Sequence, residues 1–257
     1  MQIVSFNVAG LRAIIKKNDF TEFINKCIEN VDIICLQETK CTETQANLDP
    51  KITNNYPYRY WSNSIGTTQR CGFSGTTIWS KNKPIQEILL YNFDEEGRIV
   101  ALEFDTYILI NVYVPNSQKL DSYRAEFRKG WDNIFRKTTE SVIQNYNKPI
   151  IICGDLNVAR TENDIVDPKR KKNCVAGFLD DERFGIEMHL DRLNLLDIYR
   201  EKNPDARSST YWSNFLKKPR SNMNGWRIDY FLASKQIIDK INSIEIMSNI
   251  IGSDHCP

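Results

Sequence analysis

Two short apolar runs, each ending in a polar cluster, constrain the fold most strongly. Residues 31–36 are Val-Asp-Ile-Ile-Cys-Leu and are followed by Gln37 and Glu38; residues 149–153 are Pro-Ile-Ile-Ile-Cys and are followed by Gly-Asp-Leu-Asn at 154–157. Short runs with this β-branched content are typical of strands that are buried on both faces. Such strands need helices or a second sheet to cover them, so we expect a mixed α/β fold with polar groups gathered where strands end.

The expected helices and strands follow one another along the whole chain. No internal repeat, low-complexity tract or Gly/Ser/Pro-rich linker interrupts them, so we expect one α/β domain over residues 1–257. Apolar, β-branched segments predict further strands at 2–8, 58–61, 76–80, 99–104, 107–113, 226–232 and 244–247. Apolar residues at helical spacing predict helices at 11–17, 21–29, 123–143, 187–196 and 237–241.

Composition and charge exclude several classes of protein. The 257 residues include 34 Lys and Arg against 33 Asp and Glu, which gives a net charge of +1, and 41% of them are hydrophobic. These values exclude a disordered chain and a generally basic nucleic-acid coat, so binding to nucleic acid would need a local patch. No apolar run approaches the ~18 residues of a membrane span, and no signal-peptide pattern precedes the first strand. We expect no contact with a membrane.

The cysteines predict an intracellular protein with buried thiols. There are seven of them, an odd number, no Cys-x-x-Cys occurs, and the chain has only two histidines. A disulfide framework or a Cys/His zinc site is therefore the less favoured interpretation.

The polar residues at the expected strand ends are mainly oxygen ligands. Hard oxygens without a neighbouring cysteine suit Mg²⁺ or Mn²⁺ rather than Zn²⁺. A hard metal, a carboxylate that activates water and a histidine that stabilises developing charge are the minimum needed to hydrolyse a phosphate ester. The set consists of Asn7, Glu38, Asp155, Asn157, Asp229, Asp254 and His255.

Each of these positions also has an ordinary structural explanation. The segment 154–157 is explained equally well as a turn closed by an Asx hydrogen bond, Glu38 as a solvated strand end and His255 as a surface histidine. Asp229 is harder to dismiss, because a carboxylate within an apolar strand is costly to bury without a partner. Asp229 and Asp254 could each be held by a salt bridge, so the functional argument depends on the set as a whole.

Six segments occur in a fixed order and together resemble a known family. They are residues 7–13 (Asn-Val-Ala-Gly-Leu-Arg-Ala), 36–40 (Leu-Gln-Glu-Thr-Lys), 113–116 (Tyr-Val-Pro-Asn), 154–159 (Gly-Asp-Leu-Asn-Val-Ala), 225–231 (Gly-Trp-Arg-Ile-Asp-Tyr-Phe) and 252–257 (Gly-Ser-Asp-His-Cys-Pro). Over essentially its whole length the chain resembles the exonuclease III family of apurinic/apyrimidinic (AP) endonucleases. That family lies within the Mg-dependent endonuclease/exonuclease/phosphatase superfamily. The resemblance implies a four-layer α/β sandwich, with two β-sheets packed face to face, helices outside and the active site at one edge.

The resemblance also implies a metal site. Glu38 is the expected main ligand of Mg²⁺, for which Mn²⁺ can substitute. Asn7 and Asp254 are expected nearby. Asp155 and Asn157 complete the expected set.

Catalytic roles follow from the same resemblance. Asp155 is expected to orient or deprotonate the attacking water, and Asn157 to hold that water or the phosphate. His255 is expected to contact the scissile phosphate, while Asp229 fixes its imidazole, as a carboxylate partner commonly does. Two further phosphate contacts are implied, Tyr113 and Asn116.

Substrate recognition carries over in part. The family places an extrahelical deoxyribose without its base in an aromatic and apolar pocket, and Tyr211, Trp226 and Ile228 match those positions. An abasic site flips cheaply because no base pair is lost. Two basic clusters are candidates for contacts with the DNA backbone: Lys169, Arg170, Lys171 and Lys172 in one, and Lys217, Lys218 and Arg220 in the other.

The expected function is therefore DNA base-excision repair. The chain would hydrolyse the phosphodiester 5′ to abasic sites in double-stranded DNA, with 3′-exonuclease or 3′-phosphodiesterase activity as a further expectation. It would act as a monomer, in the nucleus of a eukaryote or otherwise in the cytoplasm. Two alternatives stay open: a non-catalytic or weakly active DNA-binding relative, and a superfamily phosphoesterase that acts on another phosphodiester, such as a phosphoinositide, sphingomyelin or poly(A).

Departures from the family pattern qualify these expectations. Ala9 stands where the family usually has Asp or Asn near the metal, which predicts weaker Mg²⁺ affinity or an altered metal preference. Two extra residues after Asn173 put its role as a substrate contact in doubt, and Lys119 stands where an Arg that probes the DNA groove can occur. The segment ends two residues after His255, where relatives continue into one more apolar strand, so the domain is expected to lack this strand.

Overall fold

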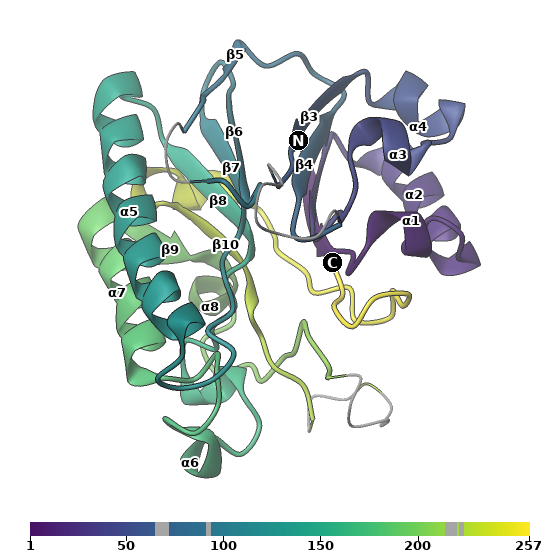
Figure 1. The fold of residues 1–257 in the computed structure, drawn as a ribbon. Helices are drawn as coiled ribbons and strands as arrows, with labels where there is room; N and C mark the ends of the chain where they lie inside the picture. Colours follow the sequence, from purple (N-terminus) through teal and green to yellow (C-terminus); the bar gives the residue numbers. More distant parts are fainter. Residues whose placement is uncertain (65–71, 91–93, 214–219, 221–223) are drawn as a thin grey trace. The chain divides into compact units, whose positions relative to one another are not determined.

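The computed structural model describes residues 1–64, 72–90, 94–213, 220 and 224–257 (Figure 1). Two units can be distinguished within it. The first unit comprises Met1–Tyr113, Cys153–Asp155 and Met247–Pro257, and the second comprises Val114–Ile152 and Leu156–Ile246. One strand, β8 (Ile150–Asp155), contributes residues to both units.

The first unit contains a four-stranded sheet whose central strands are fully buried. Strand β1 runs parallel to β2, and β4 pairs antiparallel with both β2 and β3. Every residue of β2 and β4 is buried, as the apolar run at 31–36 predicts. The order is β1 (Ile3–Asn7), β2 (Ile33–Gln37), β4 (Thr76–Ser80) and β3 (Tyr58–Ser62).

Helices cover one face of this sheet (Figure 1). The apolar side of α2 buries Phe20, Phe23 and Ile24 in a core shared with Phe6 and Ile34 of the sheet. The rings of Phe6 and Phe23 meet edge to face at 5.6 Å, a favourable geometry for an aromatic pair. The covering helices are α1 (Leu11–Ile14), α2 (Asn18–Asn30), α3 (Glu43–Ala46) and α4 (Pro50–Asn55).

A second sheet packs against the other face. Within the first unit it contains β5 (Gln86–Glu87), β6 (Ile99–Glu103), β7 (Ile108–Tyr113) and the end of β8, in that order. The Asn111 side chain of β7 donates to the carbonyls of Leu36 (3.0 Å) and Thr77 (2.9 Å) and accepts from the Gln37 amide (2.6 Å). These buried bonds satisfy polar groups between the sheets and fix the sheets' alignment.

Gly154 lets β8 approach β7 closely. Its φ is +134°, and a Cβ atom there would lie 1.9 Å from the carbonyl oxygen of Val112. Only glycine fits such an approach, and it places the following residue, Asp155, at the strand end.

The second unit contains the strand order β8-β10-β9 and long helices. Strand β10 pairs antiparallel with β9, and the Ile150 N–H donates to Ser234 Oγ (2.9 Å). Helices α5 and α7 lie side by side (Figure 1), and the Phe135 ring packs on the His189 ring at 5.3 Å. The elements are β9 (Leu195–Asp197), β10 (Asp229–Ser234), α5 (Tyr123–Tyr146), α6 (Pro168–Lys171), α7 (Asp180–Leu193), α8 (Ile198–Lys202) and the 3₁₀ segments η1 (Glu162–Asp164) and η3 (Lys235–Lys240).

The expected α/β fold with two sheets and helices is confirmed, but several element predictions differ from the structure. The helix expected at 11–17 ends at Ile14, and the helix expected at 237–241 is the 3₁₀ segment η3. The helix expected at 187–196 runs from Asp180 to Leu193, because acidic residues start it early and Asn194 ends it with φ +52°. The strand expected at 226–232 begins only at Asp229, although Trp226 bridges to Tyr211 and Ile165. The strand expected at 244–247 is wrong: these residues form no strand, and the Met247 N–H donates to the carbonyl of Pro257 (2.9 Å).

Three other expectations concern the chain as a whole. A single domain over residues 1–257 stays a prediction. Within the described residues no helix combines the length and the apolar character that crossing a bilayer would require. Six cysteines are free thiols and five of them are buried, in line with the expectation of buried thiols; Cys71 lies outside the described residues.

Candidate active site

The first unit brings polar residues from three strand ends together. Asn7 ends β1, Asp155 ends β8 and Glu38 follows β2. The Asn7 amide Nδ2 donates to Glu38 Oε1 (3.1 Å) and to Asp155 Oδ2 (2.9 Å). Its Oδ1 accepts from the Ala9 N–H (3.0 Å). Asn7 thus orients two carboxylates that would otherwise repel each other. We call Asn7, Glu38, Asp155 and His255 the carboxylate cluster.

Glu38 is held as a carboxylate by its neighbours. Burial alone would raise its pKa, but the Lys40 ammonium 2.8 Å away and the Asn7 amide outweigh this and lower the pKa below its ordinary value. Its φ is +53°, in the left-handed region that a non-glycine residue rarely adopts. Such strain is concentrated at functional sites.

Tyr113 contributes a protonated hydroxyl beside this carboxylate. Burial, together with the charge and the hydrogen bond of Glu38, raises its pKa far above its ordinary value. The Arg98 guanidinium lies 4.6 Å over the Tyr113 ring and donates to its carbonyl (2.9 Å). Tyr113 is therefore a fixed hydrogen-bond donor at neutral pH.

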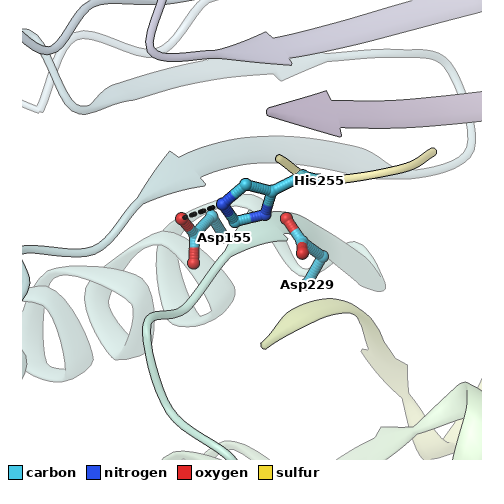
Figure 2. A group of neighbouring side chains, drawn as sticks. All are labelled: Asp155, Asp229 and His255. Atoms are coloured by element: carbon cyan, nitrogen blue, oxygen red, sulfur yellow. Dashed lines mark ion pairs between the residues drawn. The ribbon is translucent and has the colours of Figure 1, made fainter. Parts of the chain in front are cut away.

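His255 reaches the cluster from the last segment of the chain. Ser253 Oγ donates to the Asn7 carbonyl (2.7 Å) and to Asp254 Oδ1 (3.3 Å), and it accepts from the His255 N–H (3.2 Å). The His255 residue is 4% exposed, and its Nε2 lies 3.9 Å from Asp155 Oδ2 (Figure 2). Figure 2 also draws Asp229, which belongs to the second unit.

The second unit joins two asparagines from separate loops. Asn157 follows β8 with φ +50°, and its Nδ2 donates to the carbonyl of Val114 (2.9 Å). The Asn116 amide donates to Asn157 Oδ1 (2.8 Å). These two expected phosphate contacts therefore lie side by side. Asp229 begins β10, and its N–H donates to Thr210 Oγ1 (3.2 Å).

Arg128 supports both asparagine loops and was missed by the sequence reasoning. Its guanidinium donates to the carbonyls of Pro115 (2.7 Å) and Leu156 (3.0 Å) and pairs with Asp132 (2.7 Å). It is 3% exposed. One signal was available in the sequence. Arg128 lies on the expected helix 123–143, three residues before the apolar Trp131, and a charge buried at such a position needs a partner.

The three expected pocket residues also come together. Trp226 and Tyr211 exchange backbone hydrogen bonds of 2.9 Å in each direction, and both pack with the buried Ile228. We call this group the apolar cluster; it also contains Ala159, Ile165, Val175 and Phe178. Val175 belongs to the two-residue insertion noted after Asn173.

A buried ion network underlies the apolar cluster. Arg227, between Trp226 and Ile228, is 1% exposed. It donates to Asp164 Oδ1 (2.8 Å) and to both carboxylate oxygens of Asp197 (3.0 and 2.7 Å). Burial disfavours the charged guanidinium, but Tyr230, Asp197 and Asp164 more than offset this and raise the Arg227 pKa. In the sequence, Arg227 stands out only as part of the Trp-Arg-Ile-Asp segment that carries the family resemblance.

The basic candidates have different surroundings. Lys169, Arg170 and Lys172 are exposed, whereas Lys171 is half-buried with its Nζ 5.0 Å over the Trp226 ring. Arg220 lies 4.8 Å over the Trp212 ring. Lys217 and Lys218 lie outside the described residues.

Two of the positions noted as departures from the family pattern lie at the surface. Lys119 is exposed. Asn173 exchanges two hydrogen bonds of 2.7 Å with Asp180 at the start of α7.

Comparisons with known proteins identify the family. The model of the endonuclease/exonuclease/phosphatase family matches residues 4–255. The chain belongs to this family. Within it, the chain is similar to an exodeoxyribonuclease of Bacillus subtilis, at 37% identity over 260 residues that cover 100% of this chain and 97% of the relative. It is 38% identical over 262 residues to the DNA repair nuclease APEX1 of Danio rerio, covering 100% of this chain and 80% of the relative.

A solved structure shows the same fold. An AP endonuclease from Archaeoglobus fulgidus matches 100% of this chain, and 97% of its own length is covered, with a TM-score of 0.82 at 23% identity. The α/β fold of this chain is therefore the fold of that solved structure.

Enzymes of the endonuclease/exonuclease/phosphatase family depend on a divalent metal, and the carboxylate cluster fits one. Glu38 and Asp155 offer carboxylate oxygens, and Asp254 adds another in the same unit. These are hard ligands of the kind that Mg²⁺ and Mn²⁺ take. Asn7 turns its nitrogen to both carboxylates, so in this arrangement it orients the ligands.

Proposed function

We propose that this chain is a Mg²⁺-dependent DNA repair nuclease that hydrolyses the phosphodiester 5′ to abasic sites. The observation that carries the proposal is the carboxylate cluster, in which Asn7 bridges Glu38 and Asp155 beside a buried His255. Membership of the endonuclease/exonuclease/phosphatase family supports it, as do relatives named as exodeoxyribonuclease and DNA repair nuclease.

The residues of the first unit divide the work of hydrolysis. A divalent ion held by Glu38, with Asp155 and Asp254 beside it, would neutralise charge on the phosphoryl oxygens. Asp155 accepts the proton of the attacking water or orients that water. Tyr113 donates a hydrogen bond to a phosphate oxygen, and His255 stabilises the charge that develops there.

Residues of the second unit take the remaining roles in this proposal. Asn157 follows Asp155 by two residues in the sequence, and Asn116 follows Tyr113 by three. We assign the bonded Asn116–Asn157 pair to the phosphate oxygens, and Asp229 to holding the tautomer of His255.

The apolar cluster supplies the proposed specificity. Tyr211, Trp226 and Ile228 offer an aromatic and apolar surface that accepts a flipped sugar and excludes an intact nucleotide. The basic residues around 169–172 would hold the backbone of double-stranded DNA, so binding should weaken steeply with salt. The carboxylate cluster is also expected to trim 3′ ends of DNA, an activity that the name of the exodeoxyribonuclease relative suggests.

Incision of a duplex with one tetrahydrofuran abasic analogue tests the proposal. The assay is run with Mg²⁺, with EDTA and with His255→Ala, against an undamaged duplex. Mg²⁺-dependent cutting at the analogue alone, abolished in His255→Ala, is the expected result. Tight binding without cutting would identify a non-catalytic DNA-binding relative, and neither binding nor cutting would point to another phosphodiester.

A further inference from the structure

Lys171 differs from the basic residues on either side of it. Arg170 lies near Asp167 (4.0 Å) and Lys172 near Asp180 (3.7 Å), and both are exposed. Lys171 is half-buried, and its Nζ lies 5.0 Å from the centre of the Trp226 ring. Its amine is thus turned toward the apolar cluster, whereas its neighbours are turned toward surface carboxylates.

The ring under Lys171 is one that the proposed function assigns to the abasic sugar. Trp226 exchanges backbone bonds with Tyr211 and packs with Ile228 and Phe178. Gly177, with φ +86°, follows the insertion and approaches the Trp226 ring so closely that a Cβ there would lie 3.0 Å from it. The segment that carries Lys171 is therefore held against this indole from two positions.

We propose a further activity: Lys171 forms an imine with C1′ of a ring-opened abasic sugar and cleaves the strand on its 3′ side. The proposal rests on the proposed function, because it takes the apolar cluster as the place where the sugar binds. An aldehyde carbon in van der Waals contact with the Trp226 ring would lie within reach of the amine above the same ring, since a lysine side chain has four rotatable carbons.

The chemistry balances without a metal or an oxidant. The neutral Nζ attacks the C1′ aldehyde, and the carbonyl oxygen leaves as water, giving the imine. Loss of the C2′ proton to solvent moves that electron pair into a C1′–C2′ double bond, and the protonated imine nitrogen takes up the displaced pair, giving an enamine. The enamine pair then forms a C2′–C3′ double bond as the C3′–O bond breaks, which restores the imine and releases the downstream strand with its 5′ phosphate. Water hydrolyses the imine and restores the amine.

The environment of Lys171 suits a nucleophilic amine. Burial lowers its pKa and Arg170 lowers it further, while Asp167 acts in the opposite direction. Desolvation of a lysine in an apolar pocket is a known way to activate its amine. Lys169 and Lys172, on either side, are exposed.

Borohydride trapping tests the proposal separately from the proposed function. The full chain is incubated in EDTA with a duplex that carries a natural abasic site, made by removing uracil, and sodium borohydride reduces any imine to a stable amine link. A tetrahydrofuran duplex, which has no aldehyde, is the negative control. Mg²⁺-dependent incision of that same tetrahydrofuran duplex tests the proposed function without any imine.

Two matched variants and one mapping step decide the outcome. We expect a covalent complex with the natural site only, and mass spectrometry should place the sugar on Lys171. Lys171→Arg keeps the positive charge but lacks a primary amine, so the trapped yield should fall about tenfold or more. Lys202→Arg, at an exposed lysine outside the proposed DNA contacts, should keep the wild-type yield. No trapped complex, a sugar mapped mainly to another lysine, or full yield in Lys171→Arg would each overturn the proposal.

Discussion

The carboxylate cluster and the apolar cluster are held in place by different physical means. Asn7 and Asp155 end strands whose interiors are buried, so the register of the sheets positions them. Trp226 and Tyr211 are joined only by an isolated bridge, and a buried ion network around Arg227 anchors them. Backbone pairing in the sheets thus positions the carboxylate cluster, whereas ion pairs between side chains hold the apolar cluster in place.

Because of this difference, substitutions in the carboxylate cluster should mainly change activity, and substitutions in the ion network should mainly change stability. A strand end is stable without its polar side chains, so the carboxylate cluster can be altered at little cost to the fold. Removing one partner from a buried ion network is costly, because the charges that remain are buried with fewer opposite charges to compensate them. The predictions below test this distinction, from the largest expected effect to the smallest.

Asp155→Asn should abolish most activity and leave stability unchanged or slightly higher. The asparagine can still accept the Asn7 hydrogen bond, but it removes a buried negative charge close to Glu38 and cannot take a proton from water. We expect incision to fall by about 10⁴-fold, the upper end for loss of a general base. Single-turnover rates and thermal melting measure the two effects, with the exposed Asp105→Asn as the control. A clear drop in melting temperature would show that the cluster also stabilises the fold.

Arg227→Met should mainly reduce stability. It removes the guanidinium that Asp164 and Asp197 share and leaves Asp164 with Arg200 and Asp197 with Arg160 at 3.7 Å. We expect a cost of about 3 kcal/mol, the lower end for breaking a buried ion pair. Urea unfolding measures the change, and the exposed Arg192→Met is the matched control. Arg227→Lys should restore only part of the loss, because an ammonium cannot reproduce the two-pronged contact with Asp197. If Arg227→Met were as stable as the wild type, the network would not anchor the apolar cluster.

Stability should fall in mild acid because of His189 on α7. Burial lowers the pKa of His189 below its ordinary value of 6.5. The hydrogen bond to the Gly185 carbonyl and the charge of Asp132 act against this shift, whereas the charges of Arg136 and Arg128 add to it. The unfolded chain therefore binds a proton that the folded chain does not, and stability is lost as pH falls below about 6.5, by at most about 1.4 kcal/mol per pH unit. Unfolding free energies at pH 7.5 and 5.5 should differ less in His189→Gln. An equal difference in both would assign the acid sensitivity to other groups.

Ala9→Asp should have the smallest effect: a higher Mg²⁺ affinity and a slightly higher free energy of unfolding. Ala9 has φ +49°, a conformation that Asp and Asn tolerate better than Ala, so we expect a gain of about 0.5 kcal/mol in stability. A further carboxylate near Glu38, Asp155 and Asp254 should also strengthen Mg²⁺ binding by a few-fold, which calorimetric titration measures directly. Ala9→Asn separates the two effects, because it relieves the backbone without adding charge. Unchanged Mg²⁺ affinity in Ala9→Asp would show that residue 9 lies outside the metal's reach.

Sequence reasoning located the strand ends better than it located the elements around the apolar cluster. The run 31–36 and the segment 154–157 carry strong local signals, since β-branched burial and a Gly-Asp turn are written in consecutive residues. Helices α3 and α4 have little apolar periodicity, and residues 244–247 look like a strand although they form none. The carbonyl partners of Arg128 and the carboxylate partners of Arg227 could not be predicted, because these bonds join residues that are distant along the chain.

What the sequence determined by itself was the chemistry: oxygen ligands at strand ends, one histidine beside Asp254, and an ordered set of segments that identifies the family. These features depend only on the type and the order of the residues, and both can be read directly from the sequence. Tertiary structure alone decided how Asn7 faces the two carboxylates and that Lys171, among four adjacent basic residues, lies over Trp226. Hydrogen-bond direction and burial arise only when distant segments pack, because both depend on which groups lose contact with water.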